Sequence, residues 1–576
     1  MSRHPFSAFC AFVLALGVWL GGSSSIVFGD SYPFCVISGS RESSEIGMSV
    51  LRSGGNAIDA TVAVSMALGV AEPYGSGLGG KLVLLYFDKE QGTVTTYEGI
   101  EAAPETFDRF AFRELPYKKR QRGAAPVAVP GTLAVLDTVH KELGVKAWAD
   151  LILPSAKLAR QGFVMTEHDV NIFSIAQKSL RSGMGTAEFY TLEGAVPEKG
   201  MKLPNLPLAS TLERIARNGS LELYHRDGIT AQLLVNFSEK SGGEISFSDL
   251  EAYRVRKREP LSLDWGPYQL LTAPSPSSGG AVVLFSLLGL EALEADRFGT
   301  TGFYHQFAVA LQEAYALLND GFGDRLSPEQ DQERFFTESA LTTFKQRVRN
   351  ASKKERAKGE FDASVMNEDL NTDSTTHFII MDSKGNVVSA TQSLGSRFGS
   401  ATIAEGTGFL LNNSLKNFAY YTEGSPNLAG PFLRPRTTIS PMIILQNGKC
   451  VMAIGAPAGQ RIPTGVAQVV WATLKDGVPL KEAISHPRFH LPRALTRREN
   501  PNQMEFEEGV DLGMLTPLPE LGWDVRMVSA STYYFGGVNA LKIESTSGEV
   551  SAVGDERRSN ISLQEDSSER AERALR

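Results

Sequence analysis

The segment STTHFIIMD (374–382) decides how the sequence is interpreted, because a strand is predicted to begin there directly after a polar stretch. It is followed by SKGN (383–386), a turn signal, and by VVSAT (387–391), so the order predicts a β-hairpin. The preceding residues 346–373 are charged and poor in apolar side chains, which predicts an exposed, mobile linker. Ser374 and Thr375 therefore lie where a linker is expected to enter the first strand of a hairpin.

Thr375 is the candidate nucleophile at this junction. A threonine hydroxyl inside a chain is a weak nucleophile, but scission of the preceding peptide bond would free an α-amine beside it. Such an amine, with an unperturbed pKa near ~8, accepts the hydroxyl proton at neutral pH, so one residue supplies both nucleophile and base. A Thr-Thr-His sequence at the start of a strand is more commonly a sign of β-propensity alone. The motif by itself leaves both interpretations open.

Helices are expected mainly in the first half of the chain and strands mainly in the second half. The Ala-rich stretch 59–68 predicts a buried helix that ends at Gly69, and apolar residues at helical spacing predict another helix over 304–318. Turn signals predict two further hairpins, 441–455 and 540–553. Together these elements predict a mixed domain of helices and strands.

The two ends of the chain differ in composition from the rest. An apolar run followed by small residues predicts a signal peptide over 1–29, with cleavage near Gly29/Asp30. A membrane anchor is the alternative, but the apolar core is short and interrupted by Ser and Gly. We therefore expect a secreted or periplasmic protein that keeps no stable membrane span after signal removal. The charged tail 559–576 is expected to be disordered.

Composition argues against several classes of function. The chain has 57 basic and 65 acidic residues, a formal charge of −8, and no broad basic stripe, so nucleic acid is not an expected partner. Beyond the predicted signal peptide only Cys35 and Cys450 remain. These are too few for a disulfide framework and, without a histidine cluster, they do not resemble a zinc site. We expect no metal or organic cofactor.

Eight motifs spread over the chain resemble those of γ-glutamyltranspeptidase (glutathione hydrolase) proenzymes. In chain order they are GGNAIDA (54–60), EPYGSGLGG (72–80), VPGT (129–132), LARQGF (158–163), PSPSSGG (274–280), STTHF (374–378), GFLLNNS (408–414) and GAPAGQRI (455–462). The resemblance implies an α+β fold, the four-layer αββα sandwich of N-terminal-nucleophile hydrolases. It also implies self-cleavage into a large subunit (30–374) and a small subunit (375–576) that remain associated as a heterodimer. The substrate would be a small-molecule or peptide amide such as glutathione.

The resemblance also implies roles for four residues. Thr375 would be the nucleophile for self-cleavage and for turnover through an acyl-threonine intermediate. Ser393 falls where the family has a hydroxyl, usually that of Thr, which hydrogen-bonds the nucleophile. The backbone N–H groups near Ala458 and Gly459 fall at the oxyanion hole, where the family usually has two glycines. Such donors contribute roughly 3–4 kcal/mol to transition-state stabilisation in comparable enzymes.

The resemblance fails in the pocket that binds the α-carboxylate and α-ammonium of a γ-glutamyl group. The altered substrate-binding positions are Ile100, Gly395, Ser414, Asn417, Thr437 and Thr438. Ile100 stands where the family has a carboxylate-binding Arg, and Asn417 stands where it has an ammonium-binding Asp. These changes predict an uncharged pocket. A local misalignment at Ile100 is the alternative, with the nearby Arg109, Arg113 or Arg122 in the role of the missing Arg.

Three functions remain open from the sequence. The first is an amidase or acyltransferase that acts on γ-glutamyl compounds. The second keeps the Thr375 chemistry but uses another acyl group, such as a glutaryl-type amide, in a pocket that Tyr420, Tyr421 and Phe432 would line. The third is a non-catalytic secreted binding protein that retains the fold. Retention of Thr375 and Ser393 counts against the third.

Overall fold

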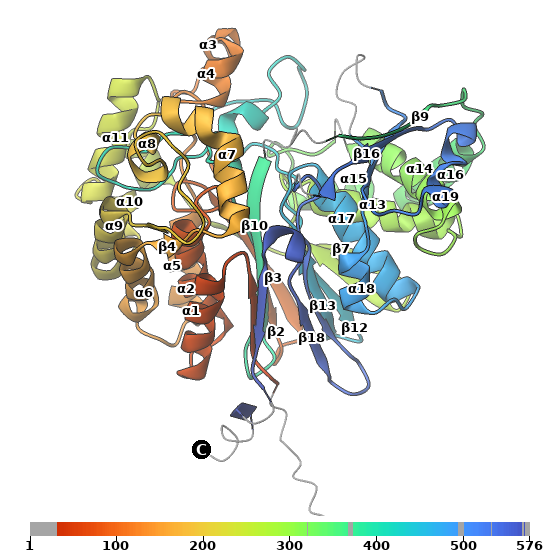
Figure 1. Ribbon diagram of the computed structural model, residues 1–576, viewed down its shortest axis with the longest axis horizontal. Helices are drawn as coiled ribbons and strands as arrows, with labels where there is room; N and C mark the ends of the chain where they lie inside the picture. Colours follow the sequence, from red (N-terminus) through yellow and green to blue (C-terminus); the bar gives the residue numbers. More distant parts are fainter. Residues whose placement is uncertain are drawn as a thin grey trace, which may run out of the picture.

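The computed structural model describes residues 32–318, 321–366, 373–492, 500–530, 533–566 and 569–570. These residues form two large antiparallel β-sheets that pack face to face, with a layer of helices outside each sheet (Figure 1). The expected α+β, four-layer αββα sandwich is therefore confirmed. None of the described helices is both long enough and apolar enough to cross a bilayer.

The first sheet contains the strand that carries Thr375. Its strand order among the described residues is β19-β1-β10-β11-β2-β3-β6. The bounds are β1 (Cys35–Ser38), β2 (Lys81–Asp88), β3 (Thr93–Gly99), β6 (Arg256–Arg258), β10 (Asp373–Met381), β11 (Val387–Ser396) and β19 (Ile561–Gln564). β10 pairs with β11 along one edge, but it pairs with β1 only over 379–381 on the other. The first half of that second edge therefore has no neighbouring strand in the described residues.

The second sheet has the order β18-β17-β13-β12-β8-β7 among the described residues. The bounds are β7 (Leu261–Trp265), β8 (Tyr268–Thr272), β12 (Met442–Gln446), β13 (Lys449–Gly455), β17 (Asn539–Ile543) and β18 (Val550–Val553). A smaller sheet has the order β14-β15-β16-β9, formed by β9 (Phe361–Met366), β14 (Phe489–His490), β15 (Gln503–Glu507) and β16 (Asp524–Val528). β4 (Phe163–Val164) and β5 (Lys202–Leu203) form a separate pair.

The two helical layers lie on opposite sides of the paired sheets (Figure 1). Beside the first sheet lie α1 (Arg41–Arg52), α2 (Ala57–Ala71), α5 (Thr132–Leu143), α6 (Trp148–Gln161), α7 (Glu167–Ser182), α8 (Thr186–Tyr190), α9 (Leu206–Asn218), α10 (Leu221–Tyr224) and α11 (Ile229–Ser241). Beside the second lie α13 (Gly279–Ala292), α14 (Thr301–Leu318), α15 (Pro328–Phe335), α16 (Glu338–Ser352), α17 (Arg461–Val470), α18 (Leu480–Ser485) and α19 (Leu512–Leu515). The remaining short helices are α3 (Arg109–Glu114), α4 (Tyr117–Gln121) and α12 (Phe247–Ala252).

The period-two alternation of β10 divides its side chains between two hydrophobic cores. Ile379 and Met381 belong to the core that includes the facing surfaces of the two sheets. Phe378 and Ile380 belong to the core between the first sheet and its helices. The strand that follows Thr375 is therefore covered on both faces, which fixes its register.

The predicted hairpins are present as β10–β11, β12–β13 and β17–β18. Asn447 and Gly448, with φ of +52° and +73°, have the two left-handed conformations of a type I′ turn. The helix expected over 59–68 is α2, but it continues through Gly69 to Ala71. A methyl group on Gly69 would lie 3.2 Å from Gly77 Cα. Gly69 therefore allows the following loop to approach the helix instead of ending it.

Two segments that were expected to lack regular structure are partly ordered. α16 continues to Ser352, because Phe344, Val348 and Ala351 are buried at helical spacing, and β9 pairs with β16. The expectation of a linker throughout 346–373 is corrected in these parts, while residues 367–372 lie outside the described residues. The expectation of disorder over 559–576 is likewise corrected, because β19 pairs with β1. The predicted signal peptide (1–29) also lies outside the described residues.

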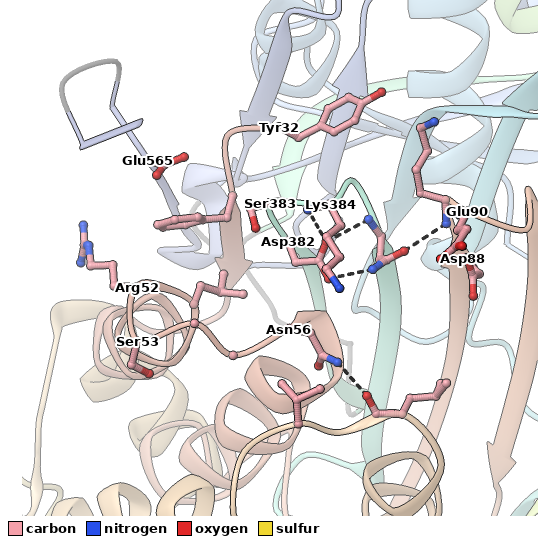
Figure 2. A pocket seen from close by; sticks show the side chains of 18 of the residues that line it. Tyr32, Arg52, Ser53, Asn56, Asp88, Glu90, Asp382, Ser383, Lys384 and Glu565 are labelled. Carbon is pink, nitrogen blue, oxygen red and sulfur yellow. Dashed lines mark hydrogen bonds between the residues drawn. The ribbon is translucent and has the colours of Figure 1, made fainter. Parts of the chain in front are cut away.

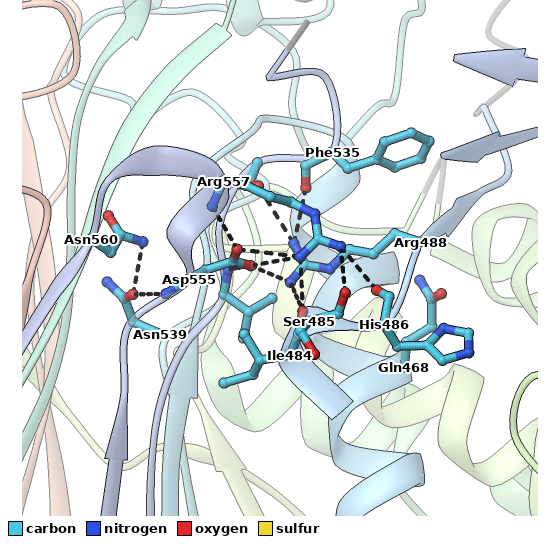
Figure 3. Close-up of polar contacts among 12 residues, drawn as sticks. Gln468, Ile484, Ser485, His486, Arg488, Phe535, Asn539, Asp555, Arg557 and Asn560 are labelled. Atoms are coloured by element: carbon cyan, nitrogen blue, oxygen red, sulfur yellow. Dashed lines mark hydrogen bonds and ion pairs between the residues drawn. The ribbon is translucent and has the colours of Figure 1, made fainter. Parts of the chain in front are cut away.

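A buried ion network joins the C-terminal strands to the helices beside the second sheet (Figure 3). The carboxylate of Asp555, which is 2% exposed, pairs with the buried guanidinium of Arg488 and with Arg557. The Asp555 N–H donates to Asn539 Oδ1 at 3.4 Å, and Asn539 Nδ2 donates to the carbonyl oxygen of His377 at 2.7 Å. The network therefore reaches β10 two residues beyond Thr375.

Candidate active site

Thr375 lies at a bulge in the pairing of β10 with β11. Between the pairs Ser374–Gly395 and Thr376–Gln392, β10 contributes one residue and β11 contributes two. A bulge of this kind breaks the ladder locally and redirects a side chain. The single β10 residue inside it is Thr375, whose side chain is 3% exposed.

Ser393 faces Thr375 from the bulged strand. The two hydroxyl oxygens, Thr375 Oγ1 and Ser393 Oγ, are 3.0 Å apart. Ser393 Oγ also donates to the carbonyl oxygen of Ser374 at 2.9 Å and accepts from the N–H of Gly395 at 3.0 Å. One hydroxyl thus contacts both the candidate nucleophile and the carbonyl of the peptide bond that precedes it.

Thr375 lines a cavity of about 340 Å³. Most of the residues expected from the sequence line it too: Ser393, Gly395, Asn417, Thr437, Thr438 and Gly459. Ser414 lies behind the lining, where its Oγ accepts from Lys81 Nζ at 3.2 Å, and Ala458 directly precedes Gly459. Ile100 does not line the cavity. Its side chain is buried in the core that includes the facing sheets, and its carbonyl oxygen accepts from Tyr253 Oη at 2.8 Å.

The backbone at Ala458 and Gly459 adopts conformations that favour glycine. The φ angles are +115° at Ala458 and +56° at Gly459. A residue with a Cβ pays about 1–3 kcal/mol in such regions, and this kind of strain occurs at functional sites. α17 begins at Arg461, so the preceding N–H groups also lie at the positive end of a helix dipole. This arrangement suits the stabilisation of an oxyanion.

Three cationic side chains that sequence reasoning missed line the cavity: Lys81, Lys416 and Arg436. Lys81 is 2% exposed, and its Nζ lies 3.0 Å from Glu101 Oε2. No acidic side chain is among the described residues of the lining. The expectation of an uncharged pocket is therefore corrected, because three cationic side chains are among the described residues that line it. The available signal was a lysine directly before the apolar run LVLLYF of β2, since lysine is rarely buried without a partner.

Two groups of side chains considered from the sequence are absent from the described lining of this cavity. The first group is Arg109, Arg113 and Arg122, which bind Glu423, Glu114 and the carbonyl oxygens of Arg397 and Gly399, respectively. The second group is Tyr420, Tyr421 and Phe432. Tyr420 stacks on Phe112 in a separate cluster, whereas Tyr421 and Phe432 are 68% and 49% exposed. The expected aromatic lining is therefore not formed.

His377 of the Thr-Thr-His sequence is buried. Its Nδ1 lies 2.9 Å from Thr391 Oγ1, and burial lowers the pKa of the imidazole to about 3. The ring is therefore uncharged at neutral pH. A methyl group on Gly455 would lie 2.3 Å from the imidazole, so β13 packs closely against this ring. These contacts fit a residue that locks β10 against the second sheet.

A larger cavity, of about 950 Å³, lies beyond the opposite end of β10 (Figure 2). Asp382, which directly follows β10, lines it, but the Asp382 carboxylate already accepts from backbone N–H groups of Ala57, Lys384 and Asn386. No pair of hydroxyls like that of Thr375 and Ser393 lines the described part of this cavity. No cluster of His, Cys, Asp or Glu in the described residues is suited to hold a metal ion. The smaller cavity is therefore the candidate active site.

Comparisons with known proteins cover most of the chain. A sequence model of the family described as Gamma-glutamyltranspeptidase matches residues 43–564. The chain is 32% identical to glutathione hydrolase 2 of Arabidopsis thaliana over 442 residues, 74% of this chain and 75% of that protein. It is 30% identical to the glutathione hydrolase proenzyme of Escherichia coli (strain K12) over 505 residues, 84% of each. A solved cephalosporin acylase from Bacillus halodurans has the same fold, with a TM-score of 0.80 at 23% identity over 92% of this chain and 96% of that one.

Proposed function

Because the chain belongs to the γ-glutamyltranspeptidase family of enzymes, we propose that it cleaves itself between Ser374 and Thr375 and then acts as an N-terminal threonine amidase. One observation carries the proposal: Ser393 Oγ lies 3.0 Å from Thr375 Oγ1 and 2.9 Å from the carbonyl oxygen of Ser374. The word proenzyme in the names of several relatives supports a cleavage step. On this proposal the large subunit ends at Ser374 and the small subunit begins at Thr375.

Self-cleavage would use the contacts present in the uncut chain. Thr375 Oγ1 attacks the carbonyl carbon of Ser374, and the Ser393 hydroxyl stabilises the negative charge that develops on the carbonyl oxygen. The carbon–nitrogen bond breaks, the Oγ1 proton passes to the departing nitrogen, and an ester then joins Ser374 to Thr375 Oγ1. Water hydrolyses this ester. Ser374 is left with a carboxylate, and Thr375 is left with a free amine and hydroxyl.

Turnover would repeat this chemistry on an external amide. The α-amine of Thr375 takes the Oγ1 proton, and Oγ1 attacks the substrate carbonyl. The N–H groups near Gly459 stabilise the oxyanion, and the leaving amine takes up the proton. The acyl group now forms an ester with Thr375. Water releases it as an acid, or an acceptor amine releases it as a new amide.

We expect the purified protein to consist of two polypeptides that meet at the Ser374–Thr375 bond. Intact mass and N-terminal sequencing should show a smaller polypeptide that begins TTHFIIMD, because the proposed cut frees Thr375. Sequencing the larger polypeptide also tests the proposed export signal, since its removal would leave Asp30 first. A wild-type chain that stays uncut after long incubation at neutral pH would refute the catalytic proposal and favour a non-catalytic binding protein.

The cationic lining favours an acyl group that has a carboxylate but no ammonium. A γ-glutamyl group carries both charges, whereas a glutaryl group carries only the carboxylate. Lys416, Arg436 and the hydroxyls of Thr437 and Thr438 line the cavity and suit a carboxylate, while its described lining offers no acidic partner for an ammonium. Burying an unpaired ammonium there would cost on the order of several kcal/mol. We therefore propose glutaryl-type amides as donors alongside γ-glutamyl compounds, with the glutaryl type preferred.

We expect kcat/KM for a glutaryl anilide to exceed that for the γ-glutamyl anilide by about tenfold or more, which corresponds to ~1.4 kcal/mol. Lys416→Met should lower kcat/KM for the glutaryl anilide, because it removes a cation from the cavity. Lys449→Met, which removes an exposed lysine of β13, is the matched control and should leave kcat/KM for the glutaryl anilide unchanged. Equal values for the two anilides, or a preference for the γ-glutamyl one, would show that the site has a partner for the ammonium.

A further inference from the structure

The loop after α2, residues 72–80, packs against the peptide proposed to be cut. A methyl group on Gly75 would lie 3.0 Å from Thr376 Oγ1, 3.1 Å from Ser374 Oγ and 3.4 Å from the carbonyl carbon of Thr375. The loop therefore packs against β10 on the side that carries the Ser374 and Thr376 side chains. Residues 374–376 are held between this loop on one side and β11 on the other.

Glu72, at the C-terminal end of α2, makes a short polar contact between this loop and β10. Thr376 Oγ1 donates to Glu72 Oε2 at 2.6 Å and accepts from Ser76 Oγ at 2.6 Å. All three side chains are buried, and none is more than 2% exposed. A methyl group on Gly39 would lie 2.2 Å from Glu72 Oε2, so the turn after β1 encloses the carboxyl from another side. The Thr376 hydroxyl is thus fixed by two hydrogen bonds, one position after the nucleophile.

We propose that Glu72 is a positioning residue for self-cleavage, an inference that rests on the proposed function. By holding the Thr376 hydroxyl, Glu72 fixes the main chain on the C-terminal side of the scissile bond. Ser393 fixes the carbonyl group on the N-terminal side. The attack joins two atoms of adjacent residues, and a displacement of ~1 Å can cost about 100-fold in rate. Both restraints are therefore needed to keep Thr375 Oγ1 directed at the carbonyl carbon of Ser374.

The charge state of Glu72 should be visible in the rate of self-cleavage. The charged and titratable groups that face its carboxyl are Arg558, Asp169 and Tyr74. Burial raises the pKa of Glu72 to about 7, although the hydrogen bond from Thr376 and the charge of Arg558 act to lower it. An ionised carboxylate accepts a hydroxyl hydrogen bond more strongly than a neutral carboxyl. Self-cleavage of the wild type is therefore expected to become faster as the pH rises through about 7.

The test follows self-cleavage by intact mass in protein made by brief cell-free synthesis. Glu72→Ala should slow the cut by about 100-fold, because Thr376 loses its acceptor. Glu72→Gln keeps a neutral acceptor oxygen, so it should cleave at a rate close to that of the low-pH wild type and show no inflection near neutral pH. Thr376→Ser keeps the hydroxyl and should cleave itself at the wild-type rate. Thr376→Val lacks the hydroxyl and should be slowed as much as Glu72→Ala.

The matched control is Glu222→Ala. Glu222 is also a buried carboxylate that accepts from a threonine hydroxyl, Thr230 Oγ1 at 2.7 Å, but it lies among the helices beside the first sheet. Its loss should lower thermal stability without slowing the cut. If Glu72→Ala does not fold, the role of Glu72 is still tested by the pH dependence of self-cleavage in Glu72→Gln and by the self-cleavage rate of Thr376→Val. Wild-type rates in Glu72→Ala or Thr376→Val, or an unchanged inflection in Glu72→Gln, would overturn the role of Glu72. An uncut wild type would instead refute self-cleavage itself.

Discussion

Thr375→Ala is expected to leave the Ser374–Thr375 bond uncut and to abolish amidase activity. The substitution removes the oxygen that attacks the Ser374 carbonyl, so neither self-cleavage nor acyl-enzyme formation can begin. Loss of a nucleophile costs on the order of 10⁶ in kcat in a well-characterised hydrolase. Thr375→Ser keeps the hydroxyl and should still be cut, as two bands on a denaturing gel would show.

The control for this prediction is Thr211→Ala. Thr211 is fully buried in α9 and its Oγ1 donates to the carbonyl oxygen of Thr407, and neither residue is among the described lining of the candidate site. Thr211→Ala removes the same atoms from a buried threonine. The folded variant should therefore cut the Ser374–Thr375 bond and hydrolyse substrate at wild-type rates. Cleavage of Thr375→Ala at the same bond would mean that another group, or a contaminating protease, performs the cut.

Asp555→Ala is expected to lower the free energy of unfolding by about 3–5 kcal/mol, because it leaves the buried guanidinium of Arg488 without its carboxylate partner. The Asp555 carboxylate also accepts from the Val538 N–H at 2.9 Å and pairs with Arg557. Urea unfolding followed by tryptophan fluorescence would measure the loss. Asp264→Ala, at an exposed position of β7, is the control and should change stability by no more than about 0.5 kcal/mol.

The same substitution predicts a dependence on pH. Burial acts to raise the pKa of Asp555, but Arg488 and Arg557 hold it below its ordinary value. A carboxyl with a lowered pKa stabilises the fold above its unfolded value of about 3.9 and loses this contribution as the pH falls through the folded value. The stability gap between wild type and Asp555→Ala should therefore be widest at neutral pH and should narrow below about pH 4. A gap that stayed constant down to pH 3 would contradict the ionised pair.

The parts of the fold that could be predicted from sequence are those set by local chemistry. The left-handed pair Asn447-Gly448 marks its hairpin without reference to the rest of the chain. β9 was missed because its exposed residues carry little apolar signal, and its pairing partner β16 lies more than 150 residues further along. The last residues of α16, 346–352, were assigned to the predicted linker because its charged residues obscured the buried positions at Val348 and Ala351.

At the candidate site, too, features set by adjacent residues could be predicted and features set by tertiary contacts could not. The junction at Thr375 could be proposed from the sequence because a polar stretch, a hydroxyl and the start of a strand are adjacent there. The cationic lining could not, because Lys81 and Arg436 are brought together only by the tertiary fold. The position of Ile100 indicated a missing charge, but whether other side chains supply one depends on which of them reach the cavity. A substitution within a family motif therefore identifies what is lost at that position and not the net charge of the pocket.

The strand order of the first sheet has a consequence for the two products of the proposed cut. β1, β2, β3 and β6 precede the proposed cut, β11 and β19 follow it, and all of β10 except Asp373 and Ser374 also follows it. In the order β19-β1-β10-β11-β2, strands of the two polypeptides therefore interleave, because β1 lies between β19 and β10 and β2 lies beside β11. Each product alone would expose unpaired strand edges within an incomplete sheet. Separation of the two products would therefore require the sheet to unfold. Dilution alone should not dissociate them, because neither product is a folded subunit by itself. Such a heterodimer behaves thermodynamically as one folded molecule with a nick in its chain.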